Sequence, residues 1–246
     1  MLYLIGTGLY YLNDLPLRSL EELKGCDEVI LERYTNLNDI SFLKNLEEEI
    51  GKKIEIVGRE TMENDYVIKK ASKEKLAVLI PGDPLAATTH FSLIQECRIK
   101  GIKTKIIHSS SIFSAMGETG LSLYKFGGTT SIPLYSENFH PESFFDVIEK
   151  NIKAGYHSLV LLEVRNQENF VSPIEAIEIL KKIEKKRECK IIEWDKVIIL
   201  SRIGSDEQKI VNINGKNLEG LKPPCSLVIP GQLNETEKEA LQSCID

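Results

Sequence analysis

The stretch Ala77-Val78-Leu79-Ile80-Pro81-Gly82-Asp83-Pro84-Leu85-Ala86-Ala87-Thr88-Thr89-His90 decides the fold class. Its first four residues form a short apolar run that stops at turn residues, which is typical of a strand buried on both faces. A helix-like segment at 91–99 follows, and Pro84 suits the first turn of a helix because its missing N–H costs nothing there. Asp83 therefore lies at the carboxyl end of a strand, where open α/β sheets bind their ligands. The stretch alone leaves two roles open for Asp83, a ligand contact or an ordinary helix N-cap.

Strands and helices alternate on both sides of this stretch. The sequence predicts further strands at 2–5, 28–32, 54–57 and 104–107, and helices at 17–26, 40–50, 62–73 and 91–100. Short connections between such elements are typical of an α/β domain with a largely parallel sheet. Two more strand ends carry small residues, Gly6-Thr7-Gly8-Leu9 and His108-Ser109-Ser110-Ser111-Ile112. Glycines there let the backbone approach a ligand, whereas the serines suit either a ligand contact or a cap on the helix expected from 112.

The pattern changes in the second half of the chain. Strands are predicted at 130–135, 158–164, 197–201, 210–213 and 226–229, and helices at 141–151 and from 173 onward. Ser172-Pro173-Ile174-Glu175 is a capping box with proline at the first helical position. Because turns alone separate several of these strands, we expect a mixed or antiparallel sheet. We therefore predict two α/β domains, 1–110 and 111–246, with a ligand cleft between them.

Composition limits the class of protein. The chain has 246 residues, a formal net charge of −6 and 42% hydrophobic residues, which argues against a nucleic-acid partner held by counterion release. Its five cysteines form no Cys-x-x-Cys pair and its four histidines lack metal-ligand spacing, so neither a disulfide framework nor a metal site is indicated. No apolar run approaches the roughly 18 residues of a membrane span, and the start of the chain carries no secretory signal. We expect a cytoplasmic protein without a membrane partner.

Few catalytic motifs are present. The chain contains no Gly-x-Ser-x-Gly elbow and no P-loop, which removes support from serine hydrolases and P-loop NTPases. Gly6-x-Gly8 with Glu32 as the ribose acid would suit a nicotinamide-dependent oxidoreductase, but Tyr11 stands where the third glycine belongs. We expect Glu32, Glu163 and Asp146 to be solvated or capping carboxylates.

Several longer motifs are specific. Gly82-Asp83-Pro84 extends through Ala87-Thr88-Thr89-His90, and three further segments stand in the second half: Gly120-Leu121-x-x-Tyr124-Lys125-Phe126-Gly127, Pro141-x-Ser143-Phe144-Phe145-Asp146 and Ser201-Arg202-Ile203-Gly204-Ser205. Through these motifs the whole chain resembles the diphthine synthase family of the tetrapyrrole-methylase-like, S-adenosylmethionine-dependent methyltransferases.

This resemblance implies a two-domain tetrapyrrole-methylase-like fold and a homodimer, with S-adenosyl-L-methionine in the cleft and S-adenosyl-L-homocysteine as its product. It also implies repeated methylation of the amine on the 3-carboxy-3-aminopropyl-modified histidine of translation elongation factor 2, a step toward diphthamide. The cofactor contacts that it implies are Leu9, Asp83, Ala86, Ser111, Ile112, Leu162, Ile203 and Asn234. Members of the family usually have histidine at the last of these positions. Asn234 followed three positions later by Glu237 also makes a good helix N-cap arrangement.

Orientation of the two reactants supplies most of the help that a methyl transfer from a sulfonium needs. We therefore expect no essential catalytic base and assign Asp83 to cofactor binding. Two other functions remain open beside this one and the oxidoreductase. A methyltransferase of the same fold could act on a tetrapyrrole or ribosomal RNA, or the chain could be an inactive ligand-binding protein, for which the asparagine at 234 is the hint.

Overall fold

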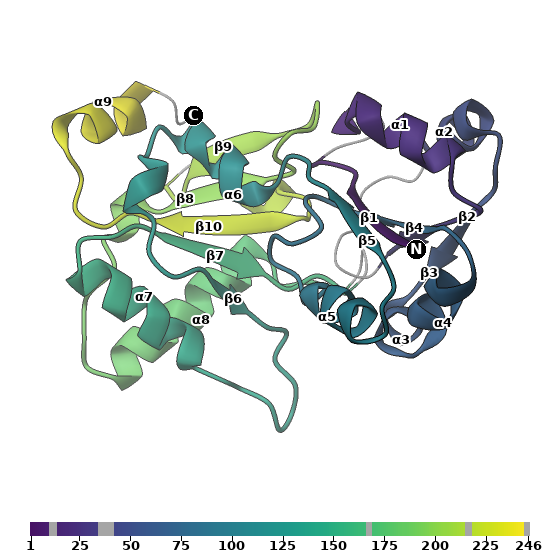
Figure 1. Cartoon of the computed structure of the whole chain (residues 1–246). Helices are drawn as coiled ribbons and strands as arrows, with labels where there is room; N and C mark the ends of the chain where they lie inside the picture. Colours follow the sequence, from purple (N-terminus) through teal and green to yellow (C-terminus); the bar gives the residue numbers. More distant parts are fainter. Residues whose placement is uncertain (10–13, 34–41, 166–168, 215–217, 244–246) are drawn as a thin grey trace. The chain divides into compact units, whose positions relative to one another are not determined.

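The structure is a computed structural model that describes residues 1–9, 14–33, 42–165, 169–214 and 218–243. The chain divides into two compact units, Met1–Phe113 and Ser114–Asp246 (Figure 1). Each unit contains one five-stranded sheet. None of the helices in the described ranges is both long and apolar enough to cross a membrane.

The first unit is built on a parallel sheet of strand order β3-β2-β4-β1-β5. Its strands are β1 (Leu2–Gly6), β2 (Glu28–Glu32), β3 (Ile54–Val57), β4 (Leu76–Ile80) and β5 (Thr104–Ile107). Every residue of the neighbouring strands β1 and β4 is buried, as expected for strands covered on both faces. The apolar run that ends at Ile80 is therefore a central strand.

Helices cover both faces of this sheet. The helices α1 (Leu17–Lys24) and α2 (Phe42–Ile50) pack on one face; α3 (Arg59–Glu63), α4 (Tyr66–Lys73) and α5 (Phe91–Ile99) pack on the other (Figure 1). The single helix predicted at 62–73 is wrong, because α3 ends before Asn64, whose Oδ1 accepts a hydrogen bond from the Tyr66 N–H at 2.7 Å. Asparagine side chains compete in this way with the helical backbone.

The second unit contains a mixed sheet of strand order β6-β7-β10-β8-β9. Its strands are β6 (Thr130–Ile132), β7 (Ser158–Leu162), β8 (Ile198–Ser201), β9 (Lys209–Asn212) and β10 (Cys225–Ile229). The β6–β7 pair is parallel and the other pairs are antiparallel, so the predicted α/β class with a parallel first sheet and a mixed second sheet is confirmed. Strand β6 ends three residues earlier than predicted because Pro133 cannot donate to the ladder.

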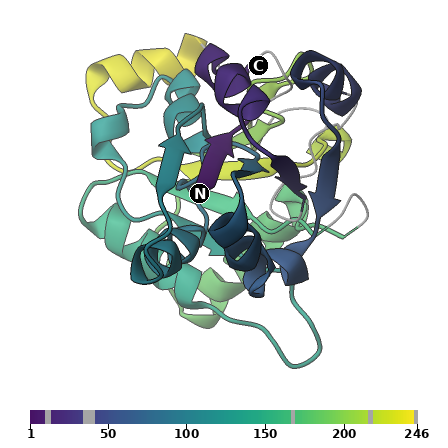
Figure 2. The same ribbon diagram turned by 45° about the vertical axis from the view of Figure 1, so that its right-hand side comes forward.

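Three long helices accompany the second sheet: α7 (Ser143–Lys153), α8 (Pro173–Lys186) and α9 (Glu235–Ser243). The predicted Ser172 N-cap at the start of α8 is confirmed, since the Ser172 hydroxyl accepts a hydrogen bond from the Glu175 N–H at 3.1 Å. The segment 133–142 between β6 and α7 extends away from the sheet as a long loop (Figure 1 and Figure 2).

Candidate functional site

Three loops meet at the carboxyl edge of the first sheet. Gly8 and Gly82 exchange two backbone hydrogen bonds, of 3.2 and 2.7 Å, which join the loops after β1 and β4. A Cβ on Gly6 would lie 2.5 Å from the Gly82 carbonyl oxygen and 2.9 Å from the Ser109 Cβ. The absence of a side chain at Gly6 therefore allows all three loops to pack against each other.

Asp83 connects two of these loops through its carboxylate. Oδ1 accepts a hydrogen bond from the Leu85 N–H at 2.9 Å, within its own loop. Oδ2 accepts one from the Ser109 N–H at 3.2 Å and lies 2.8 Å from Nδ1 of His108, both in the loop after β5. Helix α5 begins eight residues after Asp83, so the interpretation of Asp83 as its N-cap is wrong, and Pro84 is not in its first turn. Asp83 stabilises the loops themselves, with 13% of its side chain exposed.

Four other candidate residues lie on the same edge. The Leu9 N–H donates to Asp14 Oδ2 at 3.1 Å, and the Ala86 N–H donates to the Asp83 carbonyl at 3.2 Å. The Ser111 hydroxyl accepts from the Phe113 N–H at 3.3 Å and so caps α6 (Ile112–Ala115). The sequence thus identifies a group of residues that the first unit brings together: Leu9, Asp83, Ala86, Ser111 and Ile112.

The end of the loop after β4 is held by a buried pair. His90 and Glu32 are 2% and 0% exposed, and Nε2 of His90 lies 3.4 Å from Oε2 of Glu32. Burial lowers the pKa of His90, against the raising effect of Glu32. The expectation of a solvated Glu32 is therefore wrong, since this last residue of β2 is fully buried. A carboxylate with no exposed surface also cannot meet a ribose hydroxyl, which removes the main support of the oxidoreductase alternative.

The expectation of solvated or capping carboxylates is confirmed for the other two acidic residues. Oε2 of Glu163 accepts a hydrogen bond from the Leu134 N–H at 2.7 Å and so caps a backbone group. Asp146 has 62% of its side chain exposed and pairs with Arg187 at 2.5 Å on the surface of α7.

The second unit holds the remaining candidates on two opposite edges of its sheet, because β10, which precedes Asn234, runs antiparallel to β7 and β8. Leu162 ends β7 and Ile203 follows β8, and each is 6% exposed. Asn234 is exposed and precedes α9. Its Oδ1 accepts from the Glu237 N–H at 2.9 Å, and its own N–H donates to Glu237 Oε2 at 2.9 Å. The predicted N-cap arrangement is confirmed as a reciprocal capping box.

Sequence inspection missed His157 and the ion pair of Lys125 with Glu237. Both contact the Glu237 carboxylate, His157 from Nε2 at 3.1 Å and Lys125 from Nζ at 2.5 Å. Burial opposes ionisation of Glu237, but these hydrogen bonds, with those from backbone N–H groups, outweigh it and lower its pKa to about 2. No sequence pattern indicates this cluster, because its members stand 80 and 112 positions from Glu237. In the described part of the chain, no group of three or more His, Cys, Asp or Glu side chains is placed to hold a metal ion.

Comparison with known proteins places the chain among methylases. The family model for tetrapyrrole (corrin/porphyrin) methylases matches residues 1–219. The diphthine synthase of Methanocaldococcus jannaschii is 38% identical over 251 residues, covering 98% of either chain. The diphthine methyl ester synthase of Saccharomyces cerevisiae is 36% identical over 269 residues, covering all of this chain and 90% of its own.

Solved structures give the same result. A crystal structure of diphthine synthase superimposes with a TM-score of 0.85 at 28% identity, covering 100% of this chain and 96% of its own. A crystal structure of an Entamoeba histolytica protein proposed to be a diphthine synthase gives a TM-score of 0.87 at 34% identity, with 100% and 98% covered.

Proposed function

Since the chain belongs to the tetrapyrrole methylase family, groups with its diphthine synthases and is a methyltransferase, we propose that it methylates the modified histidine of translation elongation factor 2. The acceptor is the amine of the 3-carboxy-3-aminopropyl group, and S-adenosyl-L-methionine is the methyl donor. The observation that carries the proposal is the near-complete coverage by diphthine synthases at 36–38% identity. The alternatives of a tetrapyrrole or ribosomal-RNA substrate are not favoured, nor is an inactive protein.

The residues at the carboxyl edge of the first sheet have side chains of the chemical types that this cofactor needs. Leu9, Ala86 and Ile112 are partly exposed apolar residues suited to an adenine ring or methylene groups. The partly exposed carboxylate of Asp83 can accept hydrogen bonds from hydroxyl or ammonium groups of a ligand. Leu162 and Ile203, whose side chains are buried, would contribute through their backbone. We propose that these residues, with Ser111 and Asn234, bind the cofactor.

The chemistry requires orientation more than acid–base groups. Bound S-adenosylmethionine would supply a methyl group that is activated by its sulfonium. Holding the acceptor amine in line with this methyl group is the main contribution of the protein. The amine must also be unprotonated, and removal of water from its surroundings would lower its pKa. We propose no catalytic base, and we assign Asp83 to binding.

A second candidate product is a methyl ester on the carboxylate of the same substituent. It is favoured by the printed name of the yeast relative, diphthine methyl ester synthase, and by its coverage of the whole chain. The two products differ chemically, since alkali hydrolyses an ester but leaves an N-methyl group intact. We further propose that the protein is a cytoplasmic homodimer that binds neither nucleic acid nor membrane directly. Light scattering coupled to size-exclusion chromatography measures the oligomeric state.

One experiment tests the proposed function. The protein is incubated with methyl-labelled S-adenosylmethionine and elongation factor 2 that carries the carboxyaminopropyl histidine, and the factor is analysed by mass spectrometry before and after alkali. The factor with an unmodified histidine is the control. We expect label in the modified factor alone, with the mass giving the number of methyl groups. Cofactor binding without transfer would support the inactive alternative, and no cofactor binding would refute the methyltransferase proposal.

A further inference from the structure

The loop 133–142 leaves the second sheet next to a candidate cofactor residue. Strand β6 runs parallel to β7, and its last residue, Ile132, lies opposite Leu162 in the ladder. Just beyond, Glu163 Oε2 accepts a hydrogen bond from the Leu134 N–H at 2.7 Å, and the Glu163 N–H donates to the Ile132 carbonyl at 3.0 Å. The base of the loop is therefore fixed to the end of the strand that carries Leu162.

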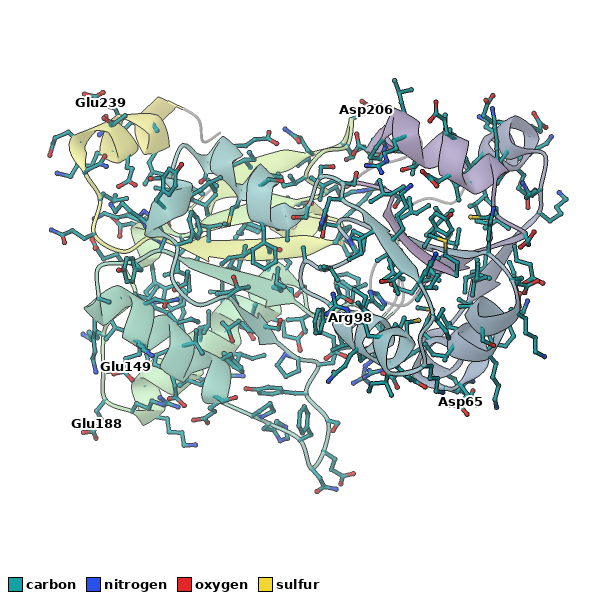
Figure 3. The ribbon with its side chains drawn as sticks, viewed as in Figure 1. Asp65, Arg98, Glu149, Glu188, Asp206 and Glu239 are labelled. Atoms are coloured by element: carbon teal, nitrogen blue, oxygen red, sulfur yellow. The ribbon has the colours of Figure 1, made fainter. Side chains whose placement is uncertain are left out.

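The far end of the loop is a closed turn. Ser136 and Phe139 exchange two backbone hydrogen bonds, of 3.2 and 3.0 Å, with Glu137 and Asn138 between them. The residues at 136–140 are all exposed, and the side chains at this end of the loop point outward into solvent (Figure 3). Phe139 itself is 52% exposed. An apolar ring is thus presented on a turn whose backbone is already ordered.

Contacts behind the turn keep the two sides of the loop together. The Tyr135 hydroxyl donates to the Pro141 carbonyl at 2.9 Å. The ring of Tyr135 meets the ring of His140 edge to face, with 4.9 Å between the two centroids. Leu134 and Tyr135 are partly buried against the core of the second unit. Because a surface that is ordered in advance loses little conformational entropy when a partner arrives, this loop is suited to binding.

The proposed acceptor is a side chain of a folded protein, so the methyltransferase must hold that protein as well as the cofactor. The polypeptide around the modified histidine has to pass close to the methyl donor, and Leu162 is one of the proposed donor contacts. The loop begins beside Leu162 and ends in an aromatic ring with polar neighbours on the same turn. A rigid aromatic anchor surrounded by polar groups is typical of the centre of a protein–protein interface.

We propose that the turn at 136–139 is a docking site for elongation factor 2, with Phe139 as the side chain that packs between residues of the factor. The inference rests on the proposed function, since that function supplies the protein acceptor. It adds a surface at which the factor is recognised apart from its modified histidine. Phe139 does not contact the cofactor in this arrangement, so it should determine the affinity for the factor and have little effect on the affinity for S-adenosyl-L-homocysteine.

The chain offers matched variants for a test. Phe139→Ala removes the anchor, and Phe139→Tyr keeps an aromatic ring at the same place. Phe91→Ala is the control, because Phe91 on α5 is also 52% exposed. Its ring lies 5.7 Å from the guanidinium carbon of Arg98, which is labelled in Figure 3. Tyr135→Phe removes only the hydrogen bond to Pro141 and so loosens the loop without changing the exposed tip.

Initial rates of methyl transfer are measured against the concentration of elongation factor 2 that carries the carboxyaminopropyl histidine. We expect Phe139→Ala to raise KM for the factor about tenfold, the effect of losing one anchoring side chain, with kcat within about twofold. Phe139→Tyr and Phe91→Ala should change KM by less than about threefold, and Tyr135→Phe should fall between them and Phe139→Ala. Calorimetry should give an unchanged affinity for S-adenosyl-L-homocysteine in all four variants, and thermal unfolding shows that each is folded.

Other outcomes overturn the inference in distinguishable ways. If Phe139→Ala leaves KM for the factor unchanged, or if Phe91→Ala raises it as much, the turn is not a docking site. If light scattering shows that Phe139→Ala breaks an oligomer of the unaltered protein, the turn contacts a second copy of the chain and the inference is refuted. If the unaltered protein binds S-adenosyl-L-homocysteine but does not methylate the factor, the proposed acceptor falls and the inference with it.

Discussion

Asp83 in the first unit and Glu237 in the second are two carboxylates that join separate segments of the chain. Asp83 joins two loops that carry candidate cofactor contacts, whereas Glu237 joins the segment before α9 to Ser122, Lys125 and His157. Each accepts hydrogen bonds from backbone N–H groups and contacts a histidine. Their surroundings differ. The histidine beside Asp83 is His108, with 66% of its side chain exposed, whereas the histidine beside Glu237 is His157, which is fully buried.

The difference separates a binding group from a supporting one. Asp83 keeps part of its side chain at the surface, where a ligand can reach it. Glu237 has all of its acceptor sites occupied by protein donors and can act on a ligand only through the backbone that it holds. We therefore expect removal of Asp83 to affect cofactor binding most, and removal of Glu237 to affect mainly stability.

The largest expected effect is that of Asp83→Ala on cofactor binding. The change removes the acceptor for the Ser109 and Leu85 N–H groups together with the group proposed to contact the cofactor. Hydrogen bonds to charged groups contribute about 1.5–3 kcal/mol each, so a loss of about 3 kcal/mol, or about 100-fold in affinity, is expected. Calorimetry with S-adenosyl-L-homocysteine measures it. His108→Ala is the control and should cost less than about threefold, because His108 itself has 66% of its side chain exposed. Unchanged affinity of Asp83→Ala would refute the binding role.

The second prediction concerns the pH dependence of stability in Glu237→Gln. The pKa of Glu237 is about 2 in the folded protein, below the usual value of 4.5. A carboxyl group with a lowered folded pKa stabilises the fold above its unfolded pKa, and this contribution is lost as the pH falls from about 4.5 toward 2. At 1.36 kcal/mol for each pKa unit, the contribution is up to about 3 kcal/mol.

Urea unfolding at a series of pH values measures this contribution. The free energy of unfolding of Glu237→Gln should lie below that of the unaltered protein at neutral pH, and the gap should narrow as the pH falls below 4.5. A gap of constant size would show that the charge of Glu237 does not stabilise the fold. Glu239→Gln, the exposed neighbour, should give no gap beyond about 0.5 kcal/mol.

The sequence predicts those features of the structure that depend on residues close to one another in the chain. Strands β2, β3 and β5 have the predicted limits, and helix α5 ends one residue earlier than predicted. The loops around Asp83 can be recognised in the sequence because each directly follows an apolar run. The Asn234–Glu237 capping box is visible for a similar reason, since its members stand three positions apart. Short-range patterns are sufficient for these features.

The features that the sequence did not predict depend on contacts between distant positions. Glu32 and His90 are 58 positions apart in the chain, and only the packing of β2 beside β4 brings them together inside the first unit. His157 is a lone histidine before a buried strand, and nothing near it in sequence indicates Gly231 or Glu237 as its partners. Burial of a titratable group is a property of tertiary packing, which local periodicity does not encode.

The third prediction tests whether the backbone packing near Asp83 and near Glu237 leaves equally little room for an added side chain. A Cβ on Gly6 would lie 2.5 Å from the Gly82 carbonyl oxygen, and a Cβ on Gly231 would lie 2.3 Å from the Tyr156 carbonyl oxygen. Since backbone atoms cannot rotate away, Gly6→Ala and Gly231→Ala should each lower the free energy of unfolding by about 1–3 kcal/mol. Gly58→Ala, with no atom within 4 Å of its added Cβ, is the control and should cost less than about 1 kcal/mol. If only Gly6→Ala lowered the free energy of unfolding, the backbone around Gly231 would be able to move aside for the added Cβ.

The smallest effect is expected from Asn234→His, which places the residue usual for the family at the N-cap of α9. Histidine cannot reproduce the bond from the Glu237 N–H to Asn234 Oδ1 well, so the free energy of unfolding should fall by about 1 kcal/mol. The imidazole can replace the amide as a hydrogen-bonding group toward the cofactor, so the affinity for S-adenosyl-L-homocysteine should change by less than about threefold in either direction.

Asn234→Asp is the matched variant, because an aspartate keeps the cap and changes only the charge at this proposed cofactor contact. Thermal unfolding and calorimetry on both variants separate the two roles of this position. If Asn234→His lost affinity as strongly as Asp83→Ala while remaining stable, the asparagine would itself be a binding group as important as Asp83. The second unit would then contribute to the cofactor site through the side chain of Asn234.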